Sequence, residues 1–189
     1  ENLPKTVPLT HRNVITNVAS AMQALGLRQD DCSIGMLPPF HSFGLLMGCL
    51  MPALASLRIV YHANPTEGNM LARLIAAYRI TMVVGTPTFI GNILRNATEA
   101  QMQSLRMAIS GAEKCPDATA ALFLEKCPQA VFLEGYGITE CSPVVALNEQ
   151  FSPRAGTIGK IINCLEWIVT DEQNQPAPPG QTGMLHLRG

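Results

Sequence analysis

The segment FLEGYGITECSP, residues 132–143, begins as an apolar strand and continues with side chains that can do chemistry. These are Glu134, Gly135, Tyr136, Thr139 and Glu140. Glycines let a flat ligand approach the backbone, and a tyrosine ring offers a stacking face. A hydroxyl beside a carboxylate suits a phosphate group and its Mg²⁺ ion, because magnesium prefers oxygen ligands. The segment therefore predicts a nucleotide site just beyond the end of a buried strand.

Three other predicted strands end in residues of similar kinds. MLPPFHSFG carries His41, VVGTPT carries Gly85 and Thr86, and AISGAEKCP carries Gly111, Ala112 and Glu113. Taken singly, the glycines are typical of turns, the histidine of a packing residue, and the glutamate of a surface ion pair with the lysine that follows it. In open α/β sheets, however, ligands bind outside the carboxyl ends of the strands. The recurrence of such residues at the same end of successive strands favours a ligand site.

Helices and strands are predicted to alternate along the first 150 residues. Thr10 is expected to cap a helix over 11–25, Ser42 to start a buried helix, and Asn64 or Thr66 to open another. Short apolar strands between helices predict an α/β fold, with a mostly parallel sheet and helices on both faces. Beyond about residue 150, period-two patterns predict antiparallel β-structure. We expect an α/β subdomain at 1–150 and the start of a β-rich subdomain at 151–189.

The amino-acid composition limits the kinds of binding partner and the kind of cellular environment that the sequence predicts. The net charge of −1 and the 14% of charged residues give no electrostatic case for binding nucleic acid or an anionic membrane. Six scattered cysteines without a CxxC pair indicate reduced thiols of a cytoplasmic protein rather than zinc ligands. The uncharged run 33–57 is long enough to span a bilayer, so a membrane-embedded helical protein is one alternative. Its internal prolines favour a buried helix beside a loop instead.

The motif EGYGITECSP resembles the YGxTE signature of the adenylate-forming superfamily, which includes acyl-CoA synthetases, luciferases and nonribosomal-peptide adenylation domains. LPKTVPLTHRNV resembles the end of the family's phosphate loop, MLPPFHSFGL its acyl-pocket motif, ISGAEKCP its adenine-flanking loop, and GQTGMLHLRG its GExGEL strand. Together these matches cover essentially the whole chain. Within the superfamily, the chain most resembles the acyl-[acyl-carrier-protein] synthetase half of bifunctional 2-acylglycerophosphoethanolamine acyltransferases, with ordinary fatty acyl-CoA ligases as the neighbouring alternative.

The resemblance implies an enzyme that uses ATP and Mg²⁺ to convert a fatty acid into an acyl-adenylate. The acyl group then passes to a thiol acceptor, either acyl carrier protein or CoA, in fatty acid metabolism or in the reacylation of lysophospholipids. Whether the parent protein associates with the inner face of the cell membrane is left open. The alternative function is a non-catalytic nucleotide-binding or interaction module on the same fold.

The resemblance also implies a catalytic set. Glu140 matches the glutamate that coordinates Mg²⁺, and Thr139 matches the threonine that binds the α-phosphate. His41 matches the residue that positions the acyl carboxylate. Gly85 and Thr86 match a loop that lines the acyl tunnel.

The nucleotide site implied by the resemblance is wider. Its adenine-binding part is Gly111, Ala112, Glu113, Glu134, Gly135 and Tyr136. Lys5 matches the lysine that ends the phosphate loop, although Asn2 and Thr6 stand where the family usually has glycine. Other family residues would lie before Glu1 and after Gly189. We therefore expect the chain to be a piece of a longer protein, without ligase activity of its own.

Overall fold

The computed structural model describes residues 6–189, which form a seven-stranded sheet and a two-stranded sheet. The strands of the large sheet are β1 (Cys32–Gly35), β2 (Arg58–Tyr61), β3 (Met82–Gly85), β4 (Met107–Ser110), β5 (Val131–Gly137), β6 (Val144–Leu147) and β7 (Lys160–Ile161). Their order across the sheet is β2-β1-β3-β4-β5-β6-β7. The first five are parallel, and β6 and β7 add antiparallel strands at one side. The predicted α/β fold with a mostly parallel sheet is confirmed.

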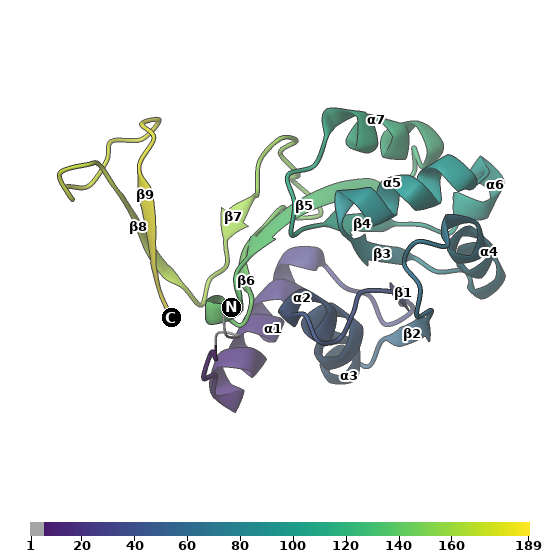
Figure 1. Ribbon diagram of the computed structural model, residues 1–189, viewed down its shortest axis with the longest axis horizontal. Coiled ribbons are helices and arrows are strands. Elements are labelled where there is room, and N and C mark those ends of the chain that lie inside the picture. The colour runs from purple at the N-terminus through teal and green to yellow at the C-terminus, as the bar shows by residue number, and fades with distance from the viewer. Residues whose placement is uncertain (1–5) are drawn as a thin grey trace, which may run out of the picture.

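Helices cover both faces of the large sheet (Figure 1). One face carries α4 (Gly68–Tyr78), α5 (Pro87–Asn96), α6 (Glu99–Met102) and α7 (Asp117–Lys126). The other carries α1 (His11–Leu25), α2 (Ser42–Leu45), the π-helical turn η1 (Leu46–Leu50) and α3 (Met51–Ala55). The central strands serve both layers by alternation: Val83 and Ala108 belong to the core under α4–α7, whereas Met82 and Ile109 belong to the core under α1–α3.

The first helix begins where the sequence predicts. The Thr10 hydroxyl accepts the N–H of Asn13, and the Asn13 side chain accepts the N–H of Thr10, which makes a capping box. Helix α4 is present as predicted but begins slightly later, with Glu67 as its N-cap residue. The helix starts at Gly68, because Asn64 folds onto the N–H and hydroxyl of Thr66 in a turn of its own.

The helical segment from Ser42 is less buried than predicted. Leu45 and Leu54 are 44% and 49% exposed, so only one side of α2–α3 packs on the sheet. The π-helical turn lies between these residues, and its Gly48 carbonyl accepts a hydrogen bond from the Tyr61 hydroxyl at 2.6 Å. This contact ties the helical segment to the edge strand β2. Among the described residues, no helix is long and apolar enough to cross a membrane.

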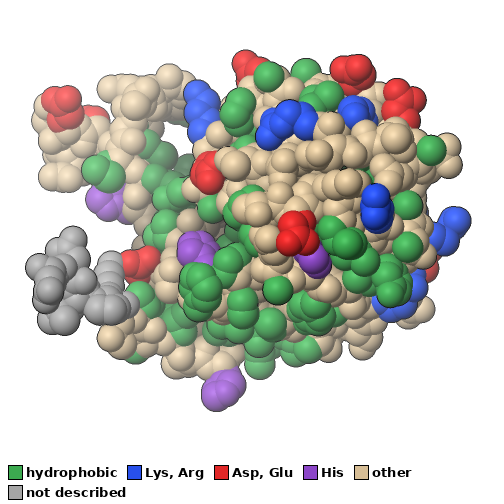
Figure 2. Space-filling model, turned by 45° about the vertical axis from the view of Figure 1, so that its right-hand side comes forward, with side chains coloured by type: hydrophobic (Ala, Val, Ile, Leu, Met, Phe, Trp, Pro, Cys, Tyr) green, Lys and Arg blue, Asp and Glu red, His purple; other side chains and the backbone are tan. Residues whose placement is uncertain are grey.

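The C-terminal part forms β8 (Glu166–Thr170) and β9 (Met184–Arg188), an antiparallel pair that projects from the body of the molecule in Figure 1. β7 lies beyond residue 150 yet pairs with β6 in the large sheet. The large sheet therefore continues into the segment expected to be β-rich, while the boundary near residue 150 stays a prediction. On the face shown in Figure 2, acidic and basic side chains are interspersed, and neither sign forms a continuous patch.

A buried ion pair joins the amino ends of three strands. Asp31 is 1% exposed and accepts hydrogen bonds from Arg106 Nε at 3.0 Å, Thr81 Oγ1 at 2.7 Å and the Arg28 N–H at 2.8 Å. These residues immediately precede or adjoin β1, β3 and β4. Burial by itself raises the pKa of Asp31, but the hydrogen bonds from Arg106, Arg28 and Thr81 outweigh it and hold the pKa below its ordinary value.

We predict that Asp31→Ala lowers the free energy of unfolding by about 3 to 5 kcal/mol, because it leaves the Arg106 guanidinium buried without its partner. Because the pKa of Asp31 is lower in the folded state, the ion pair stabilises fully above the unfolded-state pKa and is lost as pH falls through the folded-state value. Urea unfolding at pH 7 and at acidic pH measures both effects.

The exposed pair of Arg188 with Glu166 supplies the control. Glu166→Ala should change the free energy of unfolding by at most about 1 kcal/mol, because solvent screens such pairs. Equal losses in the two variants would contradict the structural role given to Asp31.

Candidate functional site

A small cavity lies at the carboxyl ends of β4 and β5. Its free volume is about 60 Å³, and its walls come from the start of α2, the residues after β4, the end of β5 and the start of β6. Five residues predicted from sequence line it together: His41, Gly111, Ala112, Gly135 and Tyr136. The structure therefore brings these five predicted residues together. What the residues bind is a separate question.

Close packing shapes the cavity. The Phe43 ring forms one wall and lies against Gly111, where an added Cβ would come within 3.3 Å of the ring. At Gly137 an added Cβ would lie 2.5 Å from the carbonyl oxygen of Pro143, which is backbone and cannot move aside. Tyr136, 41% exposed, leaves part of its ring open to solvent. A flat ligand could therefore lie against backbone on one side and an aromatic ring on the other.

His41 has a fixed orientation at the edge of this cavity. It is the N-cap residue of α2, and its Nδ1 accepts the N–H of Phe43 at 3.2 Å. This contact requires an unprotonated Nδ1, so in the neutral ring the proton lies on Nε2. An Nε2–H donor at this position could bind a carboxylate oxygen.

Thr139 lies beside the cavity rather than in its wall. It starts the 3-10 turn η2 (Thr139–Cys141), which follows β5. Its hydroxyl and that of Ser42 share a hydrogen bond of 3.0 Å. Sequence reasoning missed Ser42 as a site residue, although its place directly after His41 was a signal. The bond connects the turn to the start of α2.

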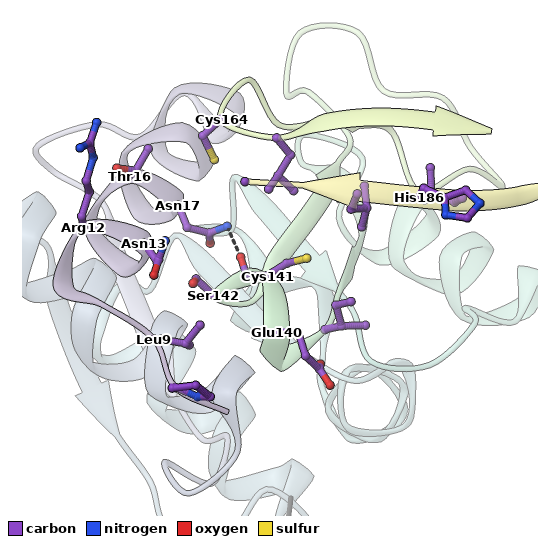
Figure 3. A pocket seen from close by; sticks show the side chains of 16 residues that line it. Leu9, Arg12, Asn13, Thr16, Asn17, Glu140, Cys141, Ser142, Cys164 and His186 are labelled. Atoms are coloured by element: carbon purple, nitrogen blue, oxygen red, sulfur yellow. Dashed lines mark hydrogen bonds between the residues drawn. The ribbon is translucent and has the colours of Figure 1, made fainter. Parts of the chain in front are cut away.

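Glu140 faces a different space. It lines a larger cavity of about 910 Å³ between α1, η2 and β9, with Arg12, Asn13 and His186 among the other lining residues (Figure 3). In a 3-10 turn successive side chains diverge by about 120°, so neighbouring residues face different sides. Glu140 and Gly111, which were predicted to share one cleft, therefore line two different cavities. Thr139, which lines neither, lies next to Glu140 and is hydrogen-bonded to Ser42 in the wall of the small cavity.

The Cys141 thiol lies in the wall of the same larger cavity. Burial, and then the negative charge of Glu140, raise its pKa. The thiol therefore stays protonated at neutral pH and is a poor nucleophile.

Gly85 and Thr86 lie at the carboxyl end of β3 but outside the small cavity's wall. An added Cβ at Gly85 would lie 2.7 Å from the Met36 methyl group, in the core. Thr86 caps α5, because its hydroxyl accepts the N–H of Phe89 at 3.3 Å. The structure explains these two residues by packing and capping, and their place in an acyl tunnel stays a prediction.

The two other predicted carboxylates have local partners. Glu113 accepts a hydrogen bond from the Thr88 hydroxyl at 3.0 Å, and Glu134 accepts the N–H of Gly156 at 3.2 Å. Neither residue lines the small cavity, although their neighbours Ala112 and Gly135 do. Lys5 lies outside the described residues.

A cavity at the carboxyl ends of parallel strands, lined by glycines, a histidine and a half-exposed tyrosine, is the place where α/β proteins commonly bind small molecules. The family of AMP-binding enzymes matches residues 2–189, and the chain belongs to this family. Its α/β fold is that of the N-terminal domain of adenylate-forming enzymes; apo MatB from Rhodopseudomonas palustris superposes with a TM-score of 0.87 at 26% identity, covering 96% of this chain and 36% of that one.

Individual relatives are acid–CoA ligases. The chain is 28% identical to a long-chain-fatty-acid–CoA ligase of Escherichia coli O6:H1, over 98% of this chain and 34% of that enzyme. It is 31% identical to 4-coumarate–CoA ligase 3 of Oryza sativa subsp. japonica, over 99% of this chain and 36% of that enzyme. The structure of a long-chain-fatty-acid–CoA ligase from Archaeoglobus fulgidus has a TM-score of 0.83 at 26% identity, covering 97% of this chain and 39% of that one. The chain thus spans about a third of the length of these curated relatives.

We predict that Gly137→Ala lowers the free energy of unfolding by about 1 to 3 kcal/mol, because the new methyl group collides with the Pro143 backbone. Gly48→Ala is the matched control, since no atom lies within 4 Å of the added Cβ and alanine favours helix. Chemical denaturation of both variants tests this. A harmless Gly137→Ala change would show that the β5–β6 turn is less tightly packed than described.

Proposed function

We propose that this chain is the central part of an ATP-dependent acid–thiol ligase, and that its small cavity holds the reacting carboxylate and the adenosine. The observation that carries the proposal is the meeting of His41, Gly111 and Tyr136 in one cavity, with Thr139 tied to its edge through Ser42. Membership of the AMP-binding enzyme family supports it. ATP-bound MatB from Rhodopseudomonas palustris, with a TM-score of 0.86 at 26% identity, supports ATP as the nucleotide.

The reaction that fits is transfer of an adenylyl group. A carboxylate oxygen of the acid attacks the α-phosphorus of ATP, a new P–O bond forms, and pyrophosphate leaves with the electrons of the broken bond. In the second step a thiolate attacks the acyl carbon, and AMP leaves. Such reactions are accelerated chiefly by positioning and by neutralising phosphate charge.

Each residue of the proposed site acts by positioning. His41 Nε2–H would donate to the attacking carboxylate, while the Nδ1 contact with Phe43 holds the ring in place. The Thr139 hydroxyl would donate to the α-phosphate. Tyr136 would stack on the adenine, with the backbone of Gly111 and Ala112 on the other side.

The metal proposal rests on Glu140. Magnesium is usually held by one or two carboxylates, with substrate phosphates and waters completing its octahedron. The described residues contain no group of three acidic, histidine or cysteine side chains that could hold a metal unaided. One carboxylate in the wall of a large cavity, next to Thr139, fits a site in which the substrate supplies the other metal ligands. When bound, the ion would neutralise charge on the phosphates.

The acid is proposed to be a fatty acid. Phe43, Val144 and Leu147 give the small cavity an apolar wall, which suits an acid with a hydrocarbon chain. The volume of about 60 Å³ is well below the several hundred that a ligand fills, so side chains at the wall must move when the acid binds. The thiol acceptor is proposed to be acyl carrier protein or CoA. With acyl carrier protein as the acceptor, the enzyme would have a role in the reacylation of lysophospholipids.

A non-catalytic nucleotide-binding module is the second candidate function. The hydrogen bonds of Glu113 and Glu134 to neighbouring parts of the chain would suit a fold in which these carboxylates have a structural role only. This candidate requires binding of AMP that is unaffected by fatty acid. Acid-dependent release of pyrophosphate from ATP by the full-length protein would exclude it.

We predict that Glu140→Ala in the full-length protein lowers the rate of acyl-adenylate formation by about 100-fold or more, because phosphate charge then lacks its metal. The measurement is hydroxamate trapping of the adenylate with C8 to C18 acids, and circular dichroism checks that the variant folds. Glu125→Ala, which removes an exposed carboxylate on α7, is the matched control and should retain full activity. Unimpaired adenylation by the Glu140 variant would remove this residue from the metal site.

A further inference from the structure

The side chain of Asn17 joins helix α1 to the turn after β5. Asn17 is 1% exposed, and its Nδ2 donates to the carbonyl oxygens of Cys141 at 2.9 Å and Val144 at 2.7 Å. Its Oδ1 accepts the N–H of Val144 at 3.1 Å. The amide therefore uses both donor hydrogens and its acceptor on backbone more than 120 residues away. Figure 3 shows the contact with Cys141 beside the larger cavity.

These contacts fix the part of the turn that directly follows the proposed phosphate and metal ligands, Thr139 and Glu140. One contact lies directly after Glu140, and the others lie just past Pro143, where β6 begins. Internal hydrogen bonds, from the Ile138 N–H to Pro143 and from the Ser142 N–H to Thr139, set the shape of the turn. They do not relate the turn to the rest of the domain. The Asn17 amide does so, because α1 packs on the sheet through its buried neighbours.

An amide is the side chain that this position requires. Two carbonyls and one N–H must be satisfied in a buried place, which needs two donors and one acceptor in one plane. A carboxylate of the same shape would face the carbonyls of Cys141 and Val144 without a hydrogen to donate. Alanine would leave three backbone groups without partners, at a cost for each. Asn17 also interrupts the apolar face of α1 between Val14 and Val18, a feature that packing alone would not favour.

We propose that Asn17 is a positioning residue of the ligase: its amide fixes the turn so that Thr139 and Glu140 meet the α-phosphate and its metal. The inference rests on the proposed function of the chain. It adds a residue that touches neither substrate nor metal, and that acts by holding the backbone directly after the residues that do. A displacement of about 1 Å in a catalytic group can cost about 100-fold in rate.

The kinetic test compares the two half-reactions in the full-length protein. With Asn17→Ala, we expect kcat for acyl-adenylate formation to fall by about 10- to 100-fold, with a smaller change in KM for the acid. Transfer to the thiol from supplied acyl-adenylate should change less than threefold, because that step no longer needs the metal-bound pyrophosphate. Asn17→Asp should be at least as impaired as Asn17→Ala. Wild-type constants for adenylation in the alanine variant would overturn the proposal.

Hydrogen exchange gives a readout that does not depend on activity. In Asn17→Ala, amides of residues 138–146 should exchange at least tenfold faster, whereas those of β1 and β4 should be unchanged. Asn17→Ser, which keeps a hydroxyl donor and acceptor, should lie between wild type and alanine, and it replaces the alanine variant should that one fail to fold. Unchanged exchange at 138–146 would overturn the proposal.

Thr81→Val is the matched control for lost stability. It removes a hydroxyl that hydrogen bonds to Asp31 and Cys32 at the opposite end of the sheet. It should lower the melting temperature without changing either half-reaction below that temperature. An equal loss of adenylation in both variants would reduce Asn17 to a general stabilising role. A wild-type protein that forms no acyl-adenylate would instead refute the proposed function itself.

Discussion

The central strands of this domain are buried on both faces, and that constraint decides where polar chemistry can occur. Alternate side chains of β3 and β4 pack into two apolar cores. A charged group on either face of these strands would therefore lower the stability of the fold. In β3 and β4 the polar residues are confined to the strand ends. At the amino ends, the Asp31 carboxylate accepts hydrogen bonds from Thr81 and Arg106. At the carboxyl ends the polar groups are spread over loops, turns and helix caps, and a cavity remains between them.

The change from parallel to antiparallel pairing at β5 places the turn that carries Thr139 and Glu140 beside that cavity. β6 returns along β5, so the connection is a short turn rather than a crossover helix. A short turn cannot aim two consecutive side chains the same way, which is why Thr139 and Glu140 face different spaces. The domain holds such a turn with contacts from elsewhere: the Ser42 hydroxyl on one side and the Asn17 amide on the other. The position of this turn therefore depends on contacts with residues that are distant in sequence.

Much of the fold could be predicted because it depends on local chemistry. Apolar runs ended by Gly or Pro mark the parallel strands, and Thr10 marks the start of α1 through a capping box. The grouping of His41, Gly111 and Tyr136 followed from the rule that carboxyl ends of parallel strands meet at one edge. The start of α4 was missed because Asn64 and Thr66 cap a local turn instead of the helix. The hydrogen bonds of Glu113, Glu134 and Asn17 join residues that are distant in sequence. A pattern along one sequence does not indicate which distant residues will pair.

The edge strand β2 has a further consequence for the protein in solution. It pairs with β1 on one side only, so within the described residues its other side presents unpaired backbone groups. The strand is only four residues long, it begins with the exposed Arg58, and its last residue is held back by the bond from Tyr61 to Gly48. A short edge strand and a charged side chain both disfavour pairing between the edge strands of two molecules. The length of β2 and the charge of Arg58 therefore disfavour aggregation of the protein through this edge of the sheet.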